Sequence, residues 1–298
     1  MEQGVEKRMK SKQKTATFFA VLAAVLYAIS SPISKLLLTK IPPTMMAAFL
    51  YLGAGIGLFI VGRVQKKMGK LQNERPLTKK ELPYTMGMVA LDIVAPILLM
   101  IGLTMTTAAN ASLLNNFEIV ATSVVALCVF KEVISKRLWL AIALVTLASI
   151  LLSVEDMRSF SFSFGSIFVL LACVCWGFEN NCTRMLSSKN PLQIVVIKGF
   201  CSGLGSLLIA LLLGEAIADG IYVLAALALG FVAYGLSILF YIYAQRELGA
   251  AKTSAYYAVA PFIGAALALV IFREIPSVSF VVALLIMIAG TYFAATDG

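Results

Sequence analysis

Apolar runs of about 18 or more residues recur along the whole length of this chain, and each run is long enough to cross a hydrocarbon layer as a helix. Hydrophobic residues make up 60% of the sequence and charged residues only 13%, whereas a soluble domain carries about 25% charged residues. The sequence therefore predicts an all-α membrane protein. We expect ten transmembrane helices, at residues 15–38, 43–62, 83–103, 110–130, 136–153, 163–187, 191–213, 221–244, 253–272 and 277–295.

Short motifs recur in the second half of the chain, which indicates an internal duplication. Phe130-Lys131-Glu132 and Phe272-Arg273-Glu274 both close an apolar run. A pair of glycines four residues apart also recurs, as Gly53 with Gly57 and Gly199 with Gly203. We expect residues 1–153 and residues 154–298 to be two five-helix repeats of one integrated membrane domain. Because five is an odd number, the second repeat enters the membrane from the opposite side, and the repeats are inverted.

The distribution of Lys and Arg predicts the orientation of the chain. Five basic residues lie in the N-terminal tail, seven lie between residues 63 and 82, and seven more lie at the turns after helices 4, 6 and 8. These 19 share one side of the membrane, whereas four lie on the other side and Lys198 lies within helix 7. By the positive-inside rule, we expect a cell-membrane protein with both termini in the cytoplasm. The net charge of +9 then reflects topology and contact with anionic lipid, and it predicts no nucleic-acid partner.

Several kinds of chemistry are disfavoured by the residues that the chain contains. It has no histidine, no Gly-rich phosphate loop, no nucleophile elbow and no zinc-site spacing. Its five cysteines all lie within predicted helices, where small packing residues are the simplest interpretation. We therefore expect no cofactor, no metal site and no enzymatic activity.

A resemblance to a known family rests on three of these features. Pro261, followed by small and apolar residues as far as Phe272-Arg273-Glu274, resembles the signature of helix 9 in EamA-type members of the drug/metabolite transporter superfamily. Trp176-Gly177 is similar to the Trp-Gly pair of the repeat's first helix, with Tyr27-Ala28 as its weaker partner. In helix 4 the equivalent of Pro261 is Ile119, which departs from the family pattern. The resemblance implies two inverted five-helix repeats and the export of amino acids or other metabolites.

Three carboxylates lie inside predicted helices, which makes them candidates for function: Asp92 in helix 3, Glu118 in helix 4 and Glu179 in helix 6. An acid in the middle of a membrane helix costs about 2.5–3.5 kcal/mol on insertion scales, so each must face water, be protonated or have a partner. One interpretation is neutralisation by basic residues in or near the helices, namely Lys35, Arg184 and Lys198. The other is that at least one acid binds substrate or carries a proton.

Glu118 is the first candidate, because polar residues surround it. Asn115, Glu118 and Thr122 follow helical spacing and would share one face, with Asn116 adjacent. A face with an acid, amides and a hydroxyl suggests a wet cavity that contacts substrate. The alternative is that these residues join neighbouring helices by hydrogen bonds.

Glu179 is the second candidate, with Trp176 one turn before it and Asn180 directly after it. An aromatic face beside a carboxylate suits an ammonium group, although Trp residues also mark membrane interfaces. Asp92 precedes Pro96 by four residues, so a kink there would free a carbonyl towards the cavity. Tyr257 matches Asn115 across the repeat and would line the opposite wall, or simply pack. Pro32 is expected to break helix 1.

These residues favour a secondary active transporter for small polar metabolites, with amino acids or amines preferred, working by alternating access. Coupling to protons by exchange is a further hypothesis. The alternative is a passive facilitator or channel that uses the same cavity. The expected partners are a small-molecule substrate, membrane lipid and protons, and the sequence specifies no oligomeric state.

Overall fold

The computed structural model describes residues 2–68, 74–131, 134–156, 161–248, 253 and 256–296, and these residues are almost entirely helical. The first repeat contains α1 (Glu2–Ala28), α2 (Ser30–Leu37), α3 (Pro43–Lys67), the 3₁₀ turn η1 (Lys79–Glu81), α4 (Leu82–Met105), α5 (Ala108–Leu114), α6 (Phe117–Phe130) and α7 (Lys136–Ser153). A short antiparallel pair, β1 (Val154–Asp156) and β2 (Ser161–Phe162), follows. The second repeat contains α8 (Phe164–Leu186), α9 (Pro191–Leu212), α10 (Gly220–Leu229), the π-helical η2 (Gly230–Leu236), α11 (Ser237–Leu248), α13 (Ala260–Phe272) and α14 (Val278–Ala295).

The described residues contain nine helical segments that are long and apolar enough to cross a membrane, so the chain is a multi-pass membrane protein. Four of these segments combine more than one element, namely α1 with α2, η1 with α4, α5 with α6, and α10 with η2 and α11. The ninth predicted helix, 253–272, contains the shorter α13, and residues 254–255 lie outside the described part. The predicted count of ten therefore stays a prediction.

The ends of equivalent helices in the two repeats have the same backbone conformation and the same capping. After α6 the chain turns through Lys131 with φ 56°, and after α13 it turns through Arg273 with φ 53°. These are the only non-glycine residues with positive φ in the described part of the chain. The next helices, α7 and α14, are both 18 residues long, and each begins with a serine side chain, Ser135 or Ser277, accepting a backbone N–H. Glu132 of the first motif lies outside the described residues.

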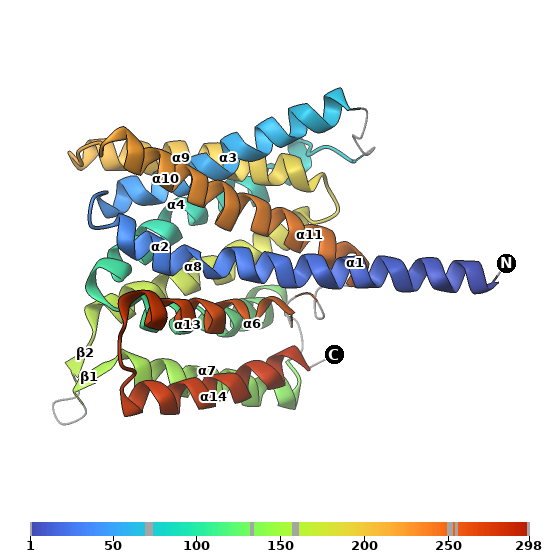
Figure 1. Cartoon of the computed structure of the whole chain (residues 1–298). Coiled ribbons are helices and arrows are strands. Elements are labelled where there is room, and N and C mark those ends of the chain that lie inside the picture. The colour runs from blue at the N-terminus through green and yellow to red at the C-terminus, as the bar shows by residue number, and fades with distance from the viewer. Residues whose placement is uncertain are drawn as a thin grey trace.

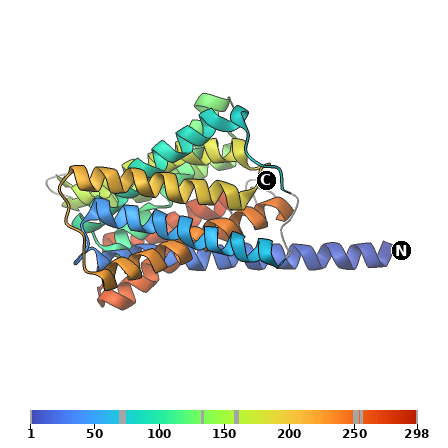
Figure 2. The same cartoon turned by 90° about the horizontal axis from the view of Figure 1, so that it is seen from above.

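The packing of the helices has the pattern expected of a pseudo-twofold axis between the repeats (Figures 1 and 2). Two pairs join equivalent helices of the two halves, α3 with α9 and α7 with α14, and α5 with α13 joins the predicted fourth helix to the predicted ninth. Two further large contacts, α4 with α8 and α1 with α11, exchange with each other when the halves are swapped. The predicted boundary after residue 153 coincides with the end of α7.

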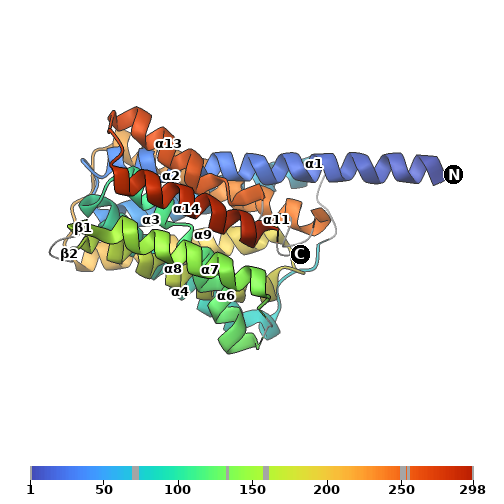
Figure 3. The same ribbon diagram turned by 90° about the horizontal axis from the view of Figure 1, so that it is seen from below.

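The direction of the helices shows that the second repeat is upside down relative to the first. Figures 1 and 3 show that α6 and α13, which are equivalent, end at opposite sides of the bundle. Both chain ends lie at the side where α6 ends, and we call this the termini side.

The two central helices, α3 and α9, meet without side chains between them. A Cβ atom on Gly199 would meet the backbone of Gly55, and a Cβ atom on Gly53 would meet the backbone of Leu227 in α10. Small residues allow such close approach in membranes, and the expectation for the recurring glycines is confirmed.

Side chains at or just beyond the ends of α9 accept hydrogen bonds from the backbone of the first repeat. Glu215, which follows α9, accepts hydrogen bonds from the backbone N–H groups of Thr44 (3.2 Å) and Met45 (2.7 Å) at the N-terminus of α3. Gln193, in the first turn of α9, accepts a hydrogen bond from the backbone N–H of Leu77 (2.9 Å), which precedes η1. The N-terminus of α3 is thus tied to the segment after α9, and the N-terminus of α9 is tied to the segment before η1.

Candidate functional site

Three interrupted helices meet in the middle of the bundle. The first helix breaks at Ile29, between α1 and α2, and the fourth breaks at Asn115 and Asn116, between α5 and α6. A turn at residues 258–259 precedes α13. The breaks surround a cavity, which we call the central pocket, lined by Tyr27, Ala28, Ser31, Ser112, Asn115, Ala260, Pro261 and Gly264.

Prolines explain two of these breaks and one further irregularity. A proline leaves the carbonyl four residues earlier without its helical donor. Pro32 does this to Ala28, and the predicted break in helix 1 is confirmed three residues before that proline. Pro261 does the same to Tyr257, and Pro96, inside α4, does so to Asp92. Backbone acceptors are therefore freed next to candidate side chains.

The central pocket is small and partly polar. Its volume is about 10 Å³, which is room for about one water molecule. The hydroxyl of Ser112, which lines it, is buried and has no hydrogen-bond partner in the described part of the chain. At the same break Asn116 is 2% exposed, and neither polar atom of its side chain is paired there. Unpaired buried polar groups are costly, so this region is suited to a polar ligand.

Glu118 lies in the first turn of α6 and is half-buried. Its Oε1 accepts a hydrogen bond of 2.6 Å from Nδ2 of Asn180 in α8, and the same amide group contacts the hydroxyl of Thr122 at 3.2 Å. Within the described residues no Lys or Arg forms an ion pair with Glu118. Its charge interacts with the hydroxyls of Tyr27 and Tyr257. Glu118 is therefore a carboxylate held by amide and hydroxyl groups beside the central pocket.

Tyrosines from four helical segments connect this carboxylate to the rest of the bundle. The ring of Tyr27 lies 5.7 Å from that of Tyr257 and 5.9 Å from that of Tyr234. The ring of Tyr234 in turn lies 5.3 Å from that of Tyr51 in α3. Tyr257 thus belongs to this group of packed rings, and the expectation that it lines a wall of the cavity stays a prediction.

Asp92 and Glu179 share one buried lysine. The Nζ atom of Lys198 lies 3.1 Å from Oδ2 of Asp92 and 2.9 Å from Oε1 of Glu179. The hydroxyl of Tyr51 donates to Oδ1 of Asp92 at 2.8 Å, and the hydroxyl of Thr183 donates to Oε1 of Glu179. Asp92, Glu179 and Lys198, which we call the ionic cluster, are 0%, 2% and 6% exposed.

The structure brings most of the predicted residues together but changes their relations. A turn at Asn115 and Asn116 separates α5 from α6, so the predicted helix is not regular throughout. The three residues nevertheless face α8, since Asn115 contacts Cys173 and both Glu118 and Thr122 contact Asn180. Asn115 also lines the central pocket.

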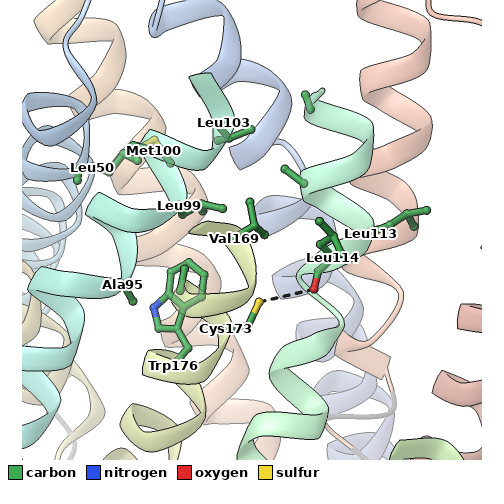
Figure 4. Packing of buried hydrophobic residues seen from close by; sticks show 14 of the residues in the cluster. Leu50, Ala95, Leu99, Met100, Leu103, Leu113, Leu114, Val169, Cys173 and Trp176 are labelled. Carbon is green, nitrogen blue, oxygen red and sulfur yellow. Dashed lines mark hydrogen bonds between the residues drawn. The ribbon is translucent and has the colours of Figure 1, made fainter. Parts of the chain in front are cut away.

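Trp176 and Glu179 are neighbours on α8 with different surroundings. Figure 4 shows the indole among Ala95, Leu99 and Val169, and it is 6% exposed. Glu179 already contacts the ammonium group of Lys198. An ammonium substrate at this place would have to compete with that lysine, and the predicted role of the pair stays a prediction.

Sequence reasoning left Tyr27 and Tyr51 out of the site. The sequence aligns Tyr27 with Trp176 across the repeat, and this alignment is the one feature that could have indicated a position of Tyr27 in the site. Tyr51 lies two residues before Gly53 in an apolar helix, and nothing in the sequence indicates that it reaches Asp92. Lys35 was considered as an acid partner, but its ammonium group donates to the carbonyls of Leu103 and of Thr106 (2.9 Å) at the end of α4.

Comparisons with known proteins agree with this architecture. The model of the EamA-like transporter family matches residues 14–154 and 163–296, one match for each repeat. An uncharacterized transporter of Methanothermobacter thermautotrophicus is 26% identical over 293 residues, which cover 93% of this chain and 85% of the relative. The uncharacterized transporter YyaM of Bacillus subtilis is 22% identical over 175 residues, covering 56% of this chain and 57% of that protein. A crystal structure with 16% identity superposes with a TM-score of 0.66 over 94% of this chain and 95% of its own, a likeness of fold.

Proposed function

Because the chain belongs to the EamA-like transporter family, we propose that it is a secondary active transporter that exports small polar metabolites, namely amino acids or amines, by alternating access. The central pocket is its substrate site. The distribution of basic residues supports a cytoplasmic position for both termini, with export running from the termini side to the other side. The protein acts without cofactor or metal, and catalysis is not part of the proposal.

The observation that carries this proposal is the state of Glu118. It is a carboxylate beside three interrupted helices, held by the amide of Asn180 and without an ion-pair partner in the described residues. A membrane helix bears such a charge at a cost of about 2.5–3.5 kcal/mol, and a cationic ligand would offset that cost. Tyr27 and Tyr257 stand close to it, and aromatic faces attract ammonium groups.

The small volume of the pocket supports a cycle in which the protein must open to load. A volume of about 10 Å³ holds no metabolite, so the interrupted helices have to move apart on one side. The α3–α9 pair is fixed by close backbone contact, and Glu215, just after α9, holds the N-terminus of α3. The moving elements are therefore α1 with α2, α5 with α6, and α13, which line the pocket. Inverted repeats give the two directions of opening similar energies.

Proteoliposomes test this proposal. Purified protein is reconstituted, loaded with single amino acids or amines, and assayed for exchange of the same radiolabelled compound. We expect exchange for a restricted set of substrates. An imposed pH gradient should then drive accumulation that a protonophore abolishes. Equilibration that ignores the pH gradient would identify a passive facilitator, and no transport of any amino acid or amine would refute the substrate class.

The variant Glu118→Gln tests the residue that carries the proposal. Glutamine keeps the hydrogen-bonding shape but removes the charge, so we expect a folded protein that binds its substrate at least tenfold more weakly, which is about 1.4 kcal/mol. The matched control is Glu81→Gln, an acid-to-amide change at a surface ion pair with Lys189 (3.1 Å). Wild-type affinity in Glu118→Gln would remove this carboxylate from the site.

A further inference from the structure

The ionic cluster contains two carboxylates and one ammonium group, so its charges do not balance. Asp92 contributes one acid from α4, Glu179 contributes another from α8, and Lys198 lies between them on α9. With all three groups ionised, the cluster has a net charge of −1. All three are more than nine-tenths buried, and a net charge buried in this way costs several kcal/mol. One additional positive charge would neutralise the cluster.

We propose that the ionic cluster is the binding site of the coupling proton, separate from the substrate site at Glu118. One proton is shared by the carboxyls of Asp92 and Glu179 while Lys198 stays charged between them. Two acids that interact so closely titrate as a unit rather than one by one. This inference rests on the proposed function, because it names the residues that would bind the proton exchanged for substrate.

A proton fits this place better than a metal ion. The ammonium group of Lys198 occupies the position between the two carboxylates, at 3.1 Å and 2.9 Å, and would repel a sodium ion there. Hydroxyl donors take two further acceptor positions, since Tyr51 donates to Oδ1 of Asp92 and Thr183 donates to Oε1 of Glu179. No group of three or more metal-binding side chains occurs in the described residues.

The position of the cluster suits a site that is closed in this conformation. Asp92, Glu179 and Lys198 lie seven to ten residues from the ends of their helices on the termini side, which is about 10–15 Å along the helix axis. Towards that side, a fully buried apolar group of Met88, Leu186 and Ile194 packs together. A proton bound at the cluster is therefore separated from the solution on the termini side.

Contacts link the cluster to the substrate site by two routes. Along α8, Glu179 is followed by Asn180, whose amide holds Glu118. Through the aromatic rings, Tyr51 bonds to Asp92 and packs on Tyr234, and Tyr234 packs on Tyr27, which lines the central pocket. A change in the charge of the cluster therefore acts on groups that contact the pocket from two directions.

Four other titratable groups surround the cluster, each on a different part of the neighbouring helices. Tyr51 from α3, Tyr234 from η2, Cys182 from α8 and Glu118 from α6 interact electrostatically with its acids. The cluster occurs in one repeat only, because Lys198 precedes Gly199 whereas the repeat partner Gly53 is preceded by the apolar Leu52. Packing of α9 alone would not need a lysine at this position.

The test measures protonation directly, without transport. The carboxylic acid C=O band is recorded by infrared spectroscopy on purified protein in sodium-free buffer while the pH is changed between about 5 and about 9. We expect one band that titrates in the wild type, is lost or shifted in Asp92→Asn and in Glu179→Gln, and persists in Glu118→Gln and Glu81→Gln. Both cluster variants leave one acid paired with Lys198, so they should fold. A titrating band unchanged in both variants would overturn the proposal, and so would a band that sodium chloride displaces and choline chloride does not.

A second measurement asks whether this proton drives transport. In proteoliposomes, Asp92→Asn and Glu179→Gln should retain substrate exchange but lose the extra accumulation that a pH gradient produces in the wild type. Gradient-driven accumulation equal to the wild type in both variants would show that the cluster does not carry the coupling proton. If no substrate is found, the proposed function fails, whereas the infrared titration still decides whether the cluster binds a proton.

Discussion

Replacing Lys198 by methionine removes the only base that contacts Asp92 and Glu179 in the described structure. Methionine has nearly the same length and is apolar, so packing is largely kept and the electrostatic effect dominates. Removing one partner of a buried ion pair costs about 3–5 kcal/mol. Here two acids lose their partner at once, and they also repel each other, so we expect a loss at the upper end of that range.

The loss should depend on pH with a defined sign. In Lys198→Met the two buried acids have no base, so ionising them at high pH destabilises the fold, whereas lowering the pH protonates them and removes this cost. The stability deficit relative to the wild type should therefore shrink as the pH falls. Unfolding can be followed in detergent by tryptophan fluorescence, because Trp176 lies one turn from Glu179 and is buried.

A compensating variant separates electrostatics from packing. In the triple variant Asp92→Asn, Glu179→Gln, Lys198→Met no charge remains, and we expect most of the lost stability to return, since uncharged replacements of a buried ionic group are often tolerated. The reasoning would be refuted if Lys198→Met unfolded like the wild type at about pH 8. It would also be refuted if the triple variant were no more stable than Lys198→Met.

Two further predictions concern the repeats. Gly199→Val should strongly lower the unfolding temperature, because the new Cβ would meet the backbone of Gly55. A normal unfolding temperature would show that α3 and α9 can separate without cost. Gly214→Ala is the comparison, because this glycine has open space around it and a positive φ, so that only backbone conformation matters. Lys131→Gly and Arg273→Gly should each stabilise the protein by up to about 1 kcal/mol, since glycine adopts positive φ without the penalty of a side chain. Equal shifts of unfolding temperature in the two variants would support the equivalence of these turns, and a loss in both would contradict it.

The repeat was the part of the fold that the sequence predicted best. The triplets ending in Glu132 and Glu274 indicated equivalent helix ends, and Lys131 and Arg273 indeed share an uncommon backbone conformation. Such local features are readable because they depend on a few neighbouring residues. Helix 4 was predicted as continuous, and its interruption at Asn115 and Asn116 was missed because an apolar run with two amides also fits an unbroken helix.

The chemistry of the site was predictable only in outline. The three acids inside membrane helices were recognised as candidates because a buried acid has a high free-energy cost. Their partners, however, depend on how helices far apart in the sequence meet. Lys198 reaches Asp92, 106 positions earlier in the chain, and Glu179 at the same time, and no spacing rule in one sequence predicts such a meeting. Trp176 fits an aromatic cage or a core equally well by sequence, and only the packing around it distinguishes them.

The unequal halves of the ionic cluster have a consequence for assembly. In a dimer of two identical half-length chains, every residue would appear twice about the axis, so such a cluster would occur twice, whereas the described residues contain it once. This contact, formed by Asp92 from the first repeat and Lys198 from the second, makes the two halves complementary rather than interchangeable. If the gene were divided between them, each fragment would be expected to recover its function only alongside the other, not with a second copy of itself.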